Sequence, residues 1–208
     1  MTKKINLAVL GSTKGTDLQA VINAIKRGEL EMADLKIIIS NKEDAYILER
    51  AKKEGFRTLF ISPKDKTREE FDREVMEVLE ENKIDLVLLI GYMRYLSKDF
   101  VEKYRNRIMN IHPSLLPAFA GGMDKNVHQA VLEHGCKVTG CTLHFVDEGA
   151  DTGPIILQKA VSITENEIVD SLKEKVQKAE QEIILKAIKL FAQGKLKIEG
   201  RRVKIYED

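Results

Sequence analysis

Short apolar runs alternate with amphipathic segments along the first half of the chain. The apolar runs predict five buried strands, at residues 5–10, 35–40, 58–61, 84–90 and 107–111. The segments between them predict four helices, at residues 17–28, 45–55, 68–83 and 99–104. Continuously apolar strands that alternate with helices are typical of a parallel sheet covered on both faces. The sequence therefore predicts an α/β fold: an open, mostly parallel, twisted sheet with helices on both faces.

The pattern changes after residue 126. We expect a helix, two longer strands and a long amphipathic helix, at residues 127–135, 137–146, 154–163 and 168–195. No linker, repeat or low-complexity segment separates these elements from the first half. We therefore expect one domain over residues 1–208, with a short hairpin-like extension at about 195–206.

Composition and charge narrow the classes of function. The 208 residues suffice to bury a full core. The formal net charge of +1 gives no electrostatic reason to expect a nucleic-acid or membrane partner. The first apolar stretch ends at Leu10, too early for a signal sequence, and no stretch approaches a transmembrane span. Cys136 and Cys141 match no metal or redox spacing, so we expect two free buried thiols in a cytoplasmic protein.

A glycine-bearing loop, GSTKGTDLQ at residues 11–19, connects the first strand to the first helix. It lacks the glycine patterns of dinucleotide-binding and Walker loops. One interpretation is an ordinary turn with a capping box from Thr16 to Gln19. The other is an anion site, because backbone N–H groups at the start of a helix can bind a phosphate. The second interpretation favours a single phosphate monoester over NAD or ATP.

Polar residues gather where the fifth predicted strand ends, in NIHPSLLP at residues 110–117. Asn110 and His112 are alternate residues, and Pro113 and Pro117 stiffen the turn that follows. An amide N–H and a protonated imidazole N–H together suit the stabilisation of a developing oxyanion. A structural histidine is the alternative interpretation.

Two further loops carry candidate chemistry. In VDEGADTGPI, at residues 146–155, the acids can be turn formers, or one carboxylate can orient and charge a histidine. In IGYMRYL, at residues 90–96, the side chains follow the most apolar strand, where open α/β sheets bind ligands. Simple packing under the next helix is the alternative there. The histidines and acids have no metal-ligand spacing, so we expect no metal.

Three of these stretches together resemble the formyltetrahydrofolate-dependent formyltransferases. They are NIHPSLLPAF at 110–119, GCTLHFVDEGADTGPIILQ at 140–158 and GYMRYLS at 91–97. GSTKGTDLQAVI at 11–22 and VQKAEQEI at 176–183 narrow the resemblance to the branch that formylates glycinamide ribonucleotide in purine synthesis. The resemblance extends from the first strand to about Phe191 and implies a Rossmann-like formyltransferase fold.

The resemblance also implies a reaction and its catalytic residues. The formyl group of 10-formyltetrahydrofolate, a co-substrate, would pass to the amine of 5′-phosphoribosylglycinamide without a metal. Asn110, His112 and Asp151 match the catalytic residues of the family. Asn110 and His112 would stabilise the oxyanion, and Asp151 would keep His112 charged and help to move a proton. The expected partners are these two small molecules, bound by a monomer or a homodimer.

Binding residues carry over by position in the same way. The ribonucleotide site would comprise the phosphate loop, the ribose-binding acid and two cleft residues: Gly15, Thr16, Asp17, Glu180, Arg68 and Met93. The folate pocket would comprise Arg94, Leu96, Val101, Val146 and Glu148. Two features depart from many relatives. Asp17 replaces an asparagine and adds a negative charge beside the phosphate, and AGGMDKN at 120–126 resembles an insertion.

Other reactions of the same superfamily are the alternatives. A formyltetrahydrofolate hydrolase would use water as the acceptor, and its relatives carry an additional N-terminal domain, whereas the first strand here starts at Ile5. A methionyl-tRNA formyltransferase would need a C-terminal β-barrel and a basic surface. A folate-binding module without activity would not need the three catalytic residues. We therefore expect the ribonucleotide formyltransferase.

Overall fold

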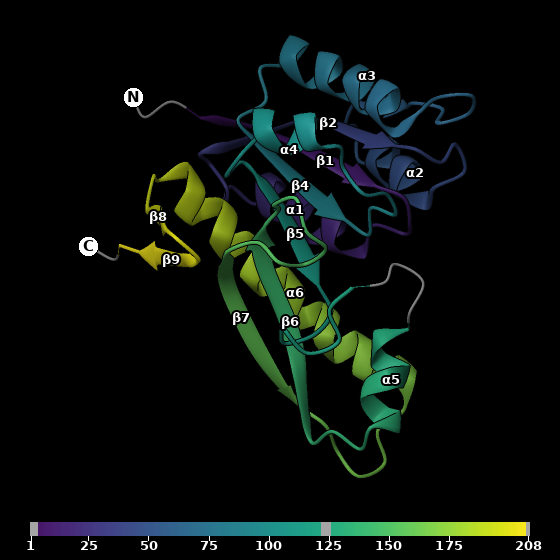
Figure 1. Ribbon diagram of the computed structural model, residues 1–208, viewed down its shortest axis with the longest axis vertical. Coiled ribbons are helices and arrows are strands. Elements are labelled where there is room, and N and C mark those ends of the chain that lie inside the picture. The colour runs from purple at the N-terminus through teal and green to yellow at the C-terminus, as the bar shows by residue number, and fades with distance from the viewer. Residues whose placement is uncertain (1–3, 122–125, 207–208) are drawn as a thin grey trace.

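The computed structural model describes residues 4–121 and 126–206. In this part of the chain, nine strands form a single sheet in the order β3-β2-β1-β4-β5-β6-β7-β9-β8 (Figure 1). Strands β1 to β5 pair in parallel, and β6 and β7 continue the sheet in antiparallel pairing. The predicted open, mostly parallel sheet is confirmed.

The element bounds agree with the sequence patterns to within a few residues. The strands are β1 (Ile5–Gly11), β2 (Ala33–Ser40), β3 (Thr58–Phe60), β4 (Leu86–Ile90), β5 (Ile108–His112), β6 (Val138–Phe145), β7 (Ile155–Ser162), β8 (Leu196–Glu199) and β9 (Arg202–Ile205). The helices are α1 (Thr16–Lys26), α2 (Tyr46–Lys53), α3 (Arg68–Glu81), α4 (Lys98–Lys103), α5 (Val127–Glu133) and α6 (Val169–Ala192).

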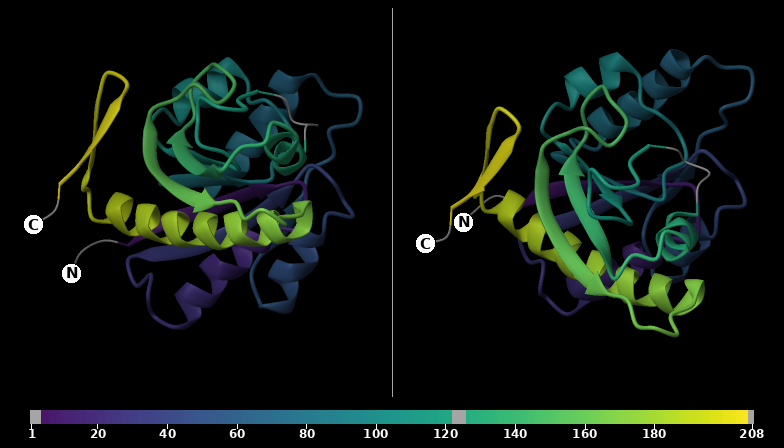
Figure 2. Two further views of the ribbon diagram at one scale, coloured as in Figure 1. Left: turned by 90° about the horizontal axis from the view of Figure 1, so that it is seen from below. Right: turned by 60° about the horizontal axis from the view of Figure 1, so that its bottom comes forward.

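Helices cover both faces of the sheet, because successive side chains of a strand point to opposite sides. In β1, Leu7 and Val9 pack in one apolar cluster with α1, α2 and α6. Ala8 and Leu10 pack in a second cluster with α3 and α4. Figure 2 shows the two helical layers on opposite sides of the strands. The continuously apolar strands predicted from the sequence are explained by this double burial.

The order of the strands creates a crevice at the carboxyl ends of β1 and β4. From β1 the chain continues to β2 and β3 on one side, and β4 then pairs with the other side of β1. Ligands bind at such switch points in open α/β sheets. Hydrogen bonds join the loop that follows β1 to the loop that follows β4. Ser12 N donates to Gly91 O at 3.1 Å, and Met93 N donates to Ser12 Oγ at 2.8 Å.

The interpretation of Thr16 to Gln19 as a capping box is wrong. The residue that precedes α1 is Gly15, with φ of 63°, and no side chain caps the helix. A side chain at Gly15 would collide with Ile47, since a Cβ there would lie 2.4 Å from Ile47 Cγ1. Among the described residues, no side chain caps the first N–H groups of α1, which is compatible with the anion-site interpretation.

The end of the chain adds a hairpin to the sheet. Strands β8 and β9 pair antiparallel, and β9 meets β7 through one bridge, Ile155 with Arg202. Both cysteines are free, and Cys141 is buried whereas Cys136 is only partly buried. Residues 122–125 of the insertion-like segment lie outside the described residues. None of the helices described is long and apolar enough to cross a membrane.

Candidate active site

Strand β5 places Asn110 and His112 on one face of the sheet. They alternate with Met109 and Ile111, which pack in the cluster of α1 and α6, so they face the side of α3 and α4. Both line a cavity of about 370 Å³. The alternation seen in the sequence therefore directs both side chains into one cavity.

A loop after β6 brings Asp151 to His112. Asp151 Oδ2 lies 3.4 Å from His112 Nδ1 and accepts a hydrogen bond from Gly121 N at 3.0 Å. Asp151 has φ of 56°, a left-handed backbone that residues other than glycine seldom adopt. Gly153 allows the chain to return, since a Cβ there would lie 1.7 Å from Phe145 O. The structure thus unites the three predicted catalytic side chains.

A fourth polar residue, His144, joins this group and was not predicted. It lies beside Asn110 in the pairing of β5 and β6. Its Nε2 is 3.2 Å from Asn110 Nδ2 and 3.7 Å from Asp151 Oδ1. Its Nδ1 is 2.9 Å from Phe145 O, an acceptor that holds the ring in place. The only sequence signal was its place in the stretch GCTLHFV, because the register of the two strands cannot be read from one sequence.

The charges of this group follow from its hydrogen bonds and its burial. The interaction with His144 is the main cause that lowers the pKa of Asp151 to about 2, although burial opposes it. Asp151 is therefore a carboxylate at neutral pH. Burial lowers the pKa of His112, and the opposing effects of Asp151 and the Phe119 carbonyl do not overcome it. Burial therefore opposes the charged form of His112 in the ligand-free protein.

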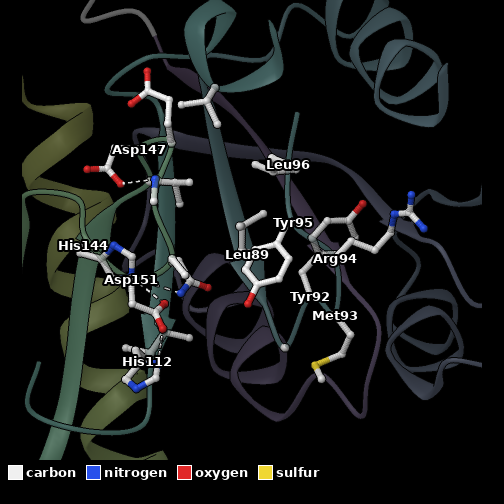
Figure 3. Close-up of a pocket in the computed structure, with 18 of the residues that line it drawn as sticks. Leu89, Tyr92, Met93, Arg94, Tyr95, Leu96, His112, His144, Asp147 and Asp151 are labelled. Atoms are coloured by element: carbon white, nitrogen blue, oxygen red, sulfur yellow. Dashed lines mark hydrogen bonds and ion pairs between the residues drawn. The ribbon is translucent and has the colours of Figure 1, made fainter. Parts of the chain in front are cut away.

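Figure 3 shows two opposite walls of the cavity. His112, His144 and Asp151 gather on one wall, and Tyr92, Met93, Arg94 and Tyr95 form the other. The lining includes all five predicted folate-pocket residues and two of the predicted ribonucleotide-site residues: Arg94, Leu96, Val101, Val146, Glu148, Arg68 and Met93. Apolar walls with a few convergent polar groups are typical of small-molecule sites.

A buried acid holds the second wall in place. Asp72 of α3 is fully buried and accepts a hydrogen bond from Ser97 N at 2.5 Å. The Arg94 guanidinium lies 4.3 Å from the centre of the Phe71 ring. These contacts fix the loop between β4 and α4 against α3. Neither Asp72 nor Ser97 was singled out in the sequence.

The remaining predicted binding residues lie outside this cavity. Gly15, Thr16 and Asp17 form the start of α1, and Glu180 lies on α6. Asp17 and Glu180 are buried, at 7% and 6% exposure. The hydrogen bond between Ser12, in the loop before α1, and Met93, in the cavity wall, connects the start of α1 to the cavity. The structure therefore divides the predicted residues between one cavity and an adjoining helix start.

Comparison with known proteins identifies the family. The formyl transferase family matches residues 5–188, most of the chain. The chain belongs to the formyl transferase family. Phosphoribosylglycinamide formyltransferase of Escherichia coli (strain K12) is 39% identical over 196 residues, which are 93% of this chain and 90% of that protein.

Further comparisons agree with this family. Glycinamide ribonucleotide transformylase 1 from Symbiobacterium toebii matches with a TM-score of 0.93 at 44% identity, over 98% of this chain and 95% of that chain. The trifunctional purine biosynthetic protein adenosine-3 of Gallus gallus is 43% identical over 95% of this chain. The chain spans only 19% of the length of that relative.

Proposed function

We propose that this formyl transferase moves the formyl group of 10-formyltetrahydrofolate to the amine of 5′-phosphoribosylglycinamide, a step of purine biosynthesis. The observation that carries the proposal is the convergence of Asn110, His112 and Asp151 in one cavity. The relatives from Escherichia coli and Symbiobacterium toebii, which bear the name of this activity, support the choice of acceptor.

The site supports a direct transfer. The amine nitrogen attacks the formyl carbon, and the carbonyl oxygen becomes negatively charged. Asn110 Nδ2 donates a hydrogen bond to this oxygen. His112, neutral before reaction, takes the proton released by the amine and then donates to the oxygen as an imidazolium, which Asp151 stabilises. The carbon–nitrogen bond to the folate then breaks, and His112 returns its proton to the leaving folate nitrogen. Removing one oxyanion donor typically costs about 3–4 kcal/mol of the barrier.

The ribonucleotide would lie along the crevice that leads to the cavity. Backbone N–H groups of Gly15, Thr16 and Asp17 would bind its phosphate, because the start of α1 carries no side-chain cap. Glu180 would bind the ribose hydroxyls. Arg68 and Met93 would line the path to the reacting amine.

The folate would occupy the rest of the cavity. Its pterin ring would lie between the two loops that carry Arg94, Leu96, Val101, Val146 and Glu148. The proposal includes one domain that works as a monomer or homodimer in the cytoplasm, where free thiols such as Cys136 and Cys141 persist. It requires no metal.

An acceptor assay tests the proposal. The purified protein is mixed with 10-formyltetrahydrofolate, and deformylation is followed by the absorbance of the folate. Three parallel reactions contain glycinamide ribonucleotide, the same amine without its phosphate, or water alone. We expect rapid turnover with the ribonucleotide only. Equal rates in all three reactions would show a hydrolase instead.

A further inference from the structure

Two acids, Asp17 and Glu180, are buried together between α1 and α6, on the sheet face opposite His112. They lie on helices that pack against each other, and each is more than nine-tenths buried. Asp17 forms a side-chain hydrogen bond with Gln181, the residue after Glu180. Its Oδ1 is buried and has no hydrogen-bond partner. Within the described residues, neither carboxyl group forms an ion pair, so nothing neutralises two charges there.

The groups that face the pair cannot supply that neutralisation. They are Gln181 and Lys173 from α6 and Cys141 from β6. Gln181 carries no charge. Burial raises the pKa of Cys141 to about 12, so its thiol is neutral. Lys173 is exposed, and it is the smallest of the influences on Glu180.

Two carboxyl groups in such a place cannot both ionise at neutral pH. Burial disfavours each charge, and a first carboxylate disfavours the second. Burial raises the pKa of Asp17 to about 6. Burial, followed by the charge of Asp17, raises the pKa of Glu180 to about 8. The two groups titrate as one unit, which keeps one proton near neutral pH.

The pair lies beside the proposed phosphate site. Asp17 is the second residue of α1, next to the uncapped N–H groups that follow Gly15. A negative charge in this first turn offsets part of the positive field that the helix offers to a phosphate. A second negative charge in the pair would weaken the site further, since little water screens it there.

We propose that Asp17 and Glu180 share one proton when the enzyme binds its ribonucleotide, and that loss of this proton weakens binding of the phosphorylated substrate. Asp17 is therefore a positioning residue that acts through Glu180 and sets the upper pH limit of substrate recognition. This inference rests on the proposed function, because the ribonucleotide is the ligand concerned.

The test compares the wild-type protein with Asp17→Asn, an isosteric variant that cannot ionise. Above the midpoint of Glu180 at about 8, binding that needs the shared proton weakens tenfold per pH unit. From about pH 7 to about pH 9, the wild-type KM for the ribonucleotide should rise about tenfold more than that of the variant. The ratio of the two KM values removes the ionisation of the substrate itself, which is common to both.

Two controls accompany this ratio. Asp170 is the second residue of α6 and is exposed, so Asp170→Asn should follow the wild-type pH profile. The KM of each variant for 10-formyltetrahydrofolate, divided by that of the wild-type protein, should stay constant over the same pH range. A ribonucleotide KM ratio between wild type and Asp17→Asn that stays constant from about pH 7 to about pH 9 would overturn the inference.

A binding-independent measurement separates this inference from the proposed function. Since the folded pKa values are raised, the unfolded chain releases these protons at lower pH than the folded one. The free energy of unfolding should therefore fall as pH rises from about 4 to about 8, and it should fall less in Asp17→Asn. Equal pH dependence in both proteins would refute the shared proton even if the wild-type protein formylates no ribonucleotide. If the pH dependence of the free energy of unfolding differs but no formyl transfer occurs, the proposed function is refuted and the shared proton is still supported.

Discussion

Asp151 and Glu180 are both largely shielded from water, yet their environments change their acidity in opposite directions. Asp151 lies near two histidines and accepts a backbone N–H bond, and its pKa falls to about 2. Glu180 faces another acid on the opposite sheet face, and its pKa rises to about 8. Burial opposes ionisation at both places. The difference shows that burial raises the pKa of an acid unless hydrogen-bond donors around it outweigh the effect, as they do at Asp151 and not at Glu180.

The largest expected effect tests the first of these acids. Asp151→Asn keeps the size of the side chain and tolerates the left-handed backbone. It removes the charge that stabilises the imidazolium of His112. We expect the turnover number to fall by about 10³–10⁴-fold, as in dyads that lose their carboxylate, with little change in either KM. The measurement is steady-state kinetics, with thermal unfolding as the control for folding. Turnover within a few-fold of wild type would make Asp151 only a turn former.

A second prediction concerns the donor that the sequence did not reveal. His144→Phe removes the ring nitrogens near Asn110 and Asp151 but retains an aromatic ring in β6. The two side chains would then lose their orientation, and misplacement of this kind can cost about 10²-fold in rate. We expect a fall of that order in turnover, together with a higher pKa of Asp151 by NMR titration. If the pKa of Asp151 does not change, contacts other than that with His144 must lower it.

A smaller effect is expected at the second acid. Glu180→Gln keeps the shape of the side chain but removes its ionisable group. If this acid binds the ribose, the KM for the ribonucleotide should rise about tenfold, near the upper limit for a hydrogen bond between neutral groups. The KM for 10-formyltetrahydrofolate should not change. Equal loss for both substrates would indicate a general disturbance of α6 instead.

The smallest expected effect compares Asp151 with the Asp17–Glu180 pair directly, through the free energy of unfolding as a function of pH. The folded pKa of Asp151 is lowered, so its contribution is present above about pH 4 and is lost as pH falls toward 2. We expect it to be about 1 kcal/mol, since the site is partly open to solvent. The free energy of unfolding of Asp151→Asn, measured by chemical denaturation, should not show this decrease between about pH 4 and pH 2. Together with Asp17→Asn, whose difference lies between about pH 4 and 8, the two variants should deviate from wild type in separate pH ranges.

The sequence predicted the sheet and its helices because apolar runs record burial on two faces, as in β1 and β4. It also predicted Asn110 and His112 as neighbours, since alternate residues of a strand share a face. Asp151 was placed through family resemblance, and the structure brings it to His112.

What the sequence could not predict depends on contacts between distant segments. His144 meets Asn110 through the register of β5 and β6, which a single sequence does not encode visibly. The charge of His112 depends on how deeply the folded protein buries it. The meeting of Asp17 with Glu180 depends on the packing of α1 against α6. The capping box failed because Gly15 adopts a conformation that propensity alone does not impose.

The left-handed backbone at Asp151 limits how this protein can change over evolutionary time. With φ of 56°, the position tolerates Asn and Gly well and most other residues poorly. Both tolerated replacements are one nucleotide away from an aspartate codon, and both lack the carboxylate. Under the proposed mechanism, a mutation that spares the fold here therefore removes the carboxylate that the reaction needs. Descendants that drift at this position should persist as folded pseudoenzymes, able to hold both ligands and unable to join them.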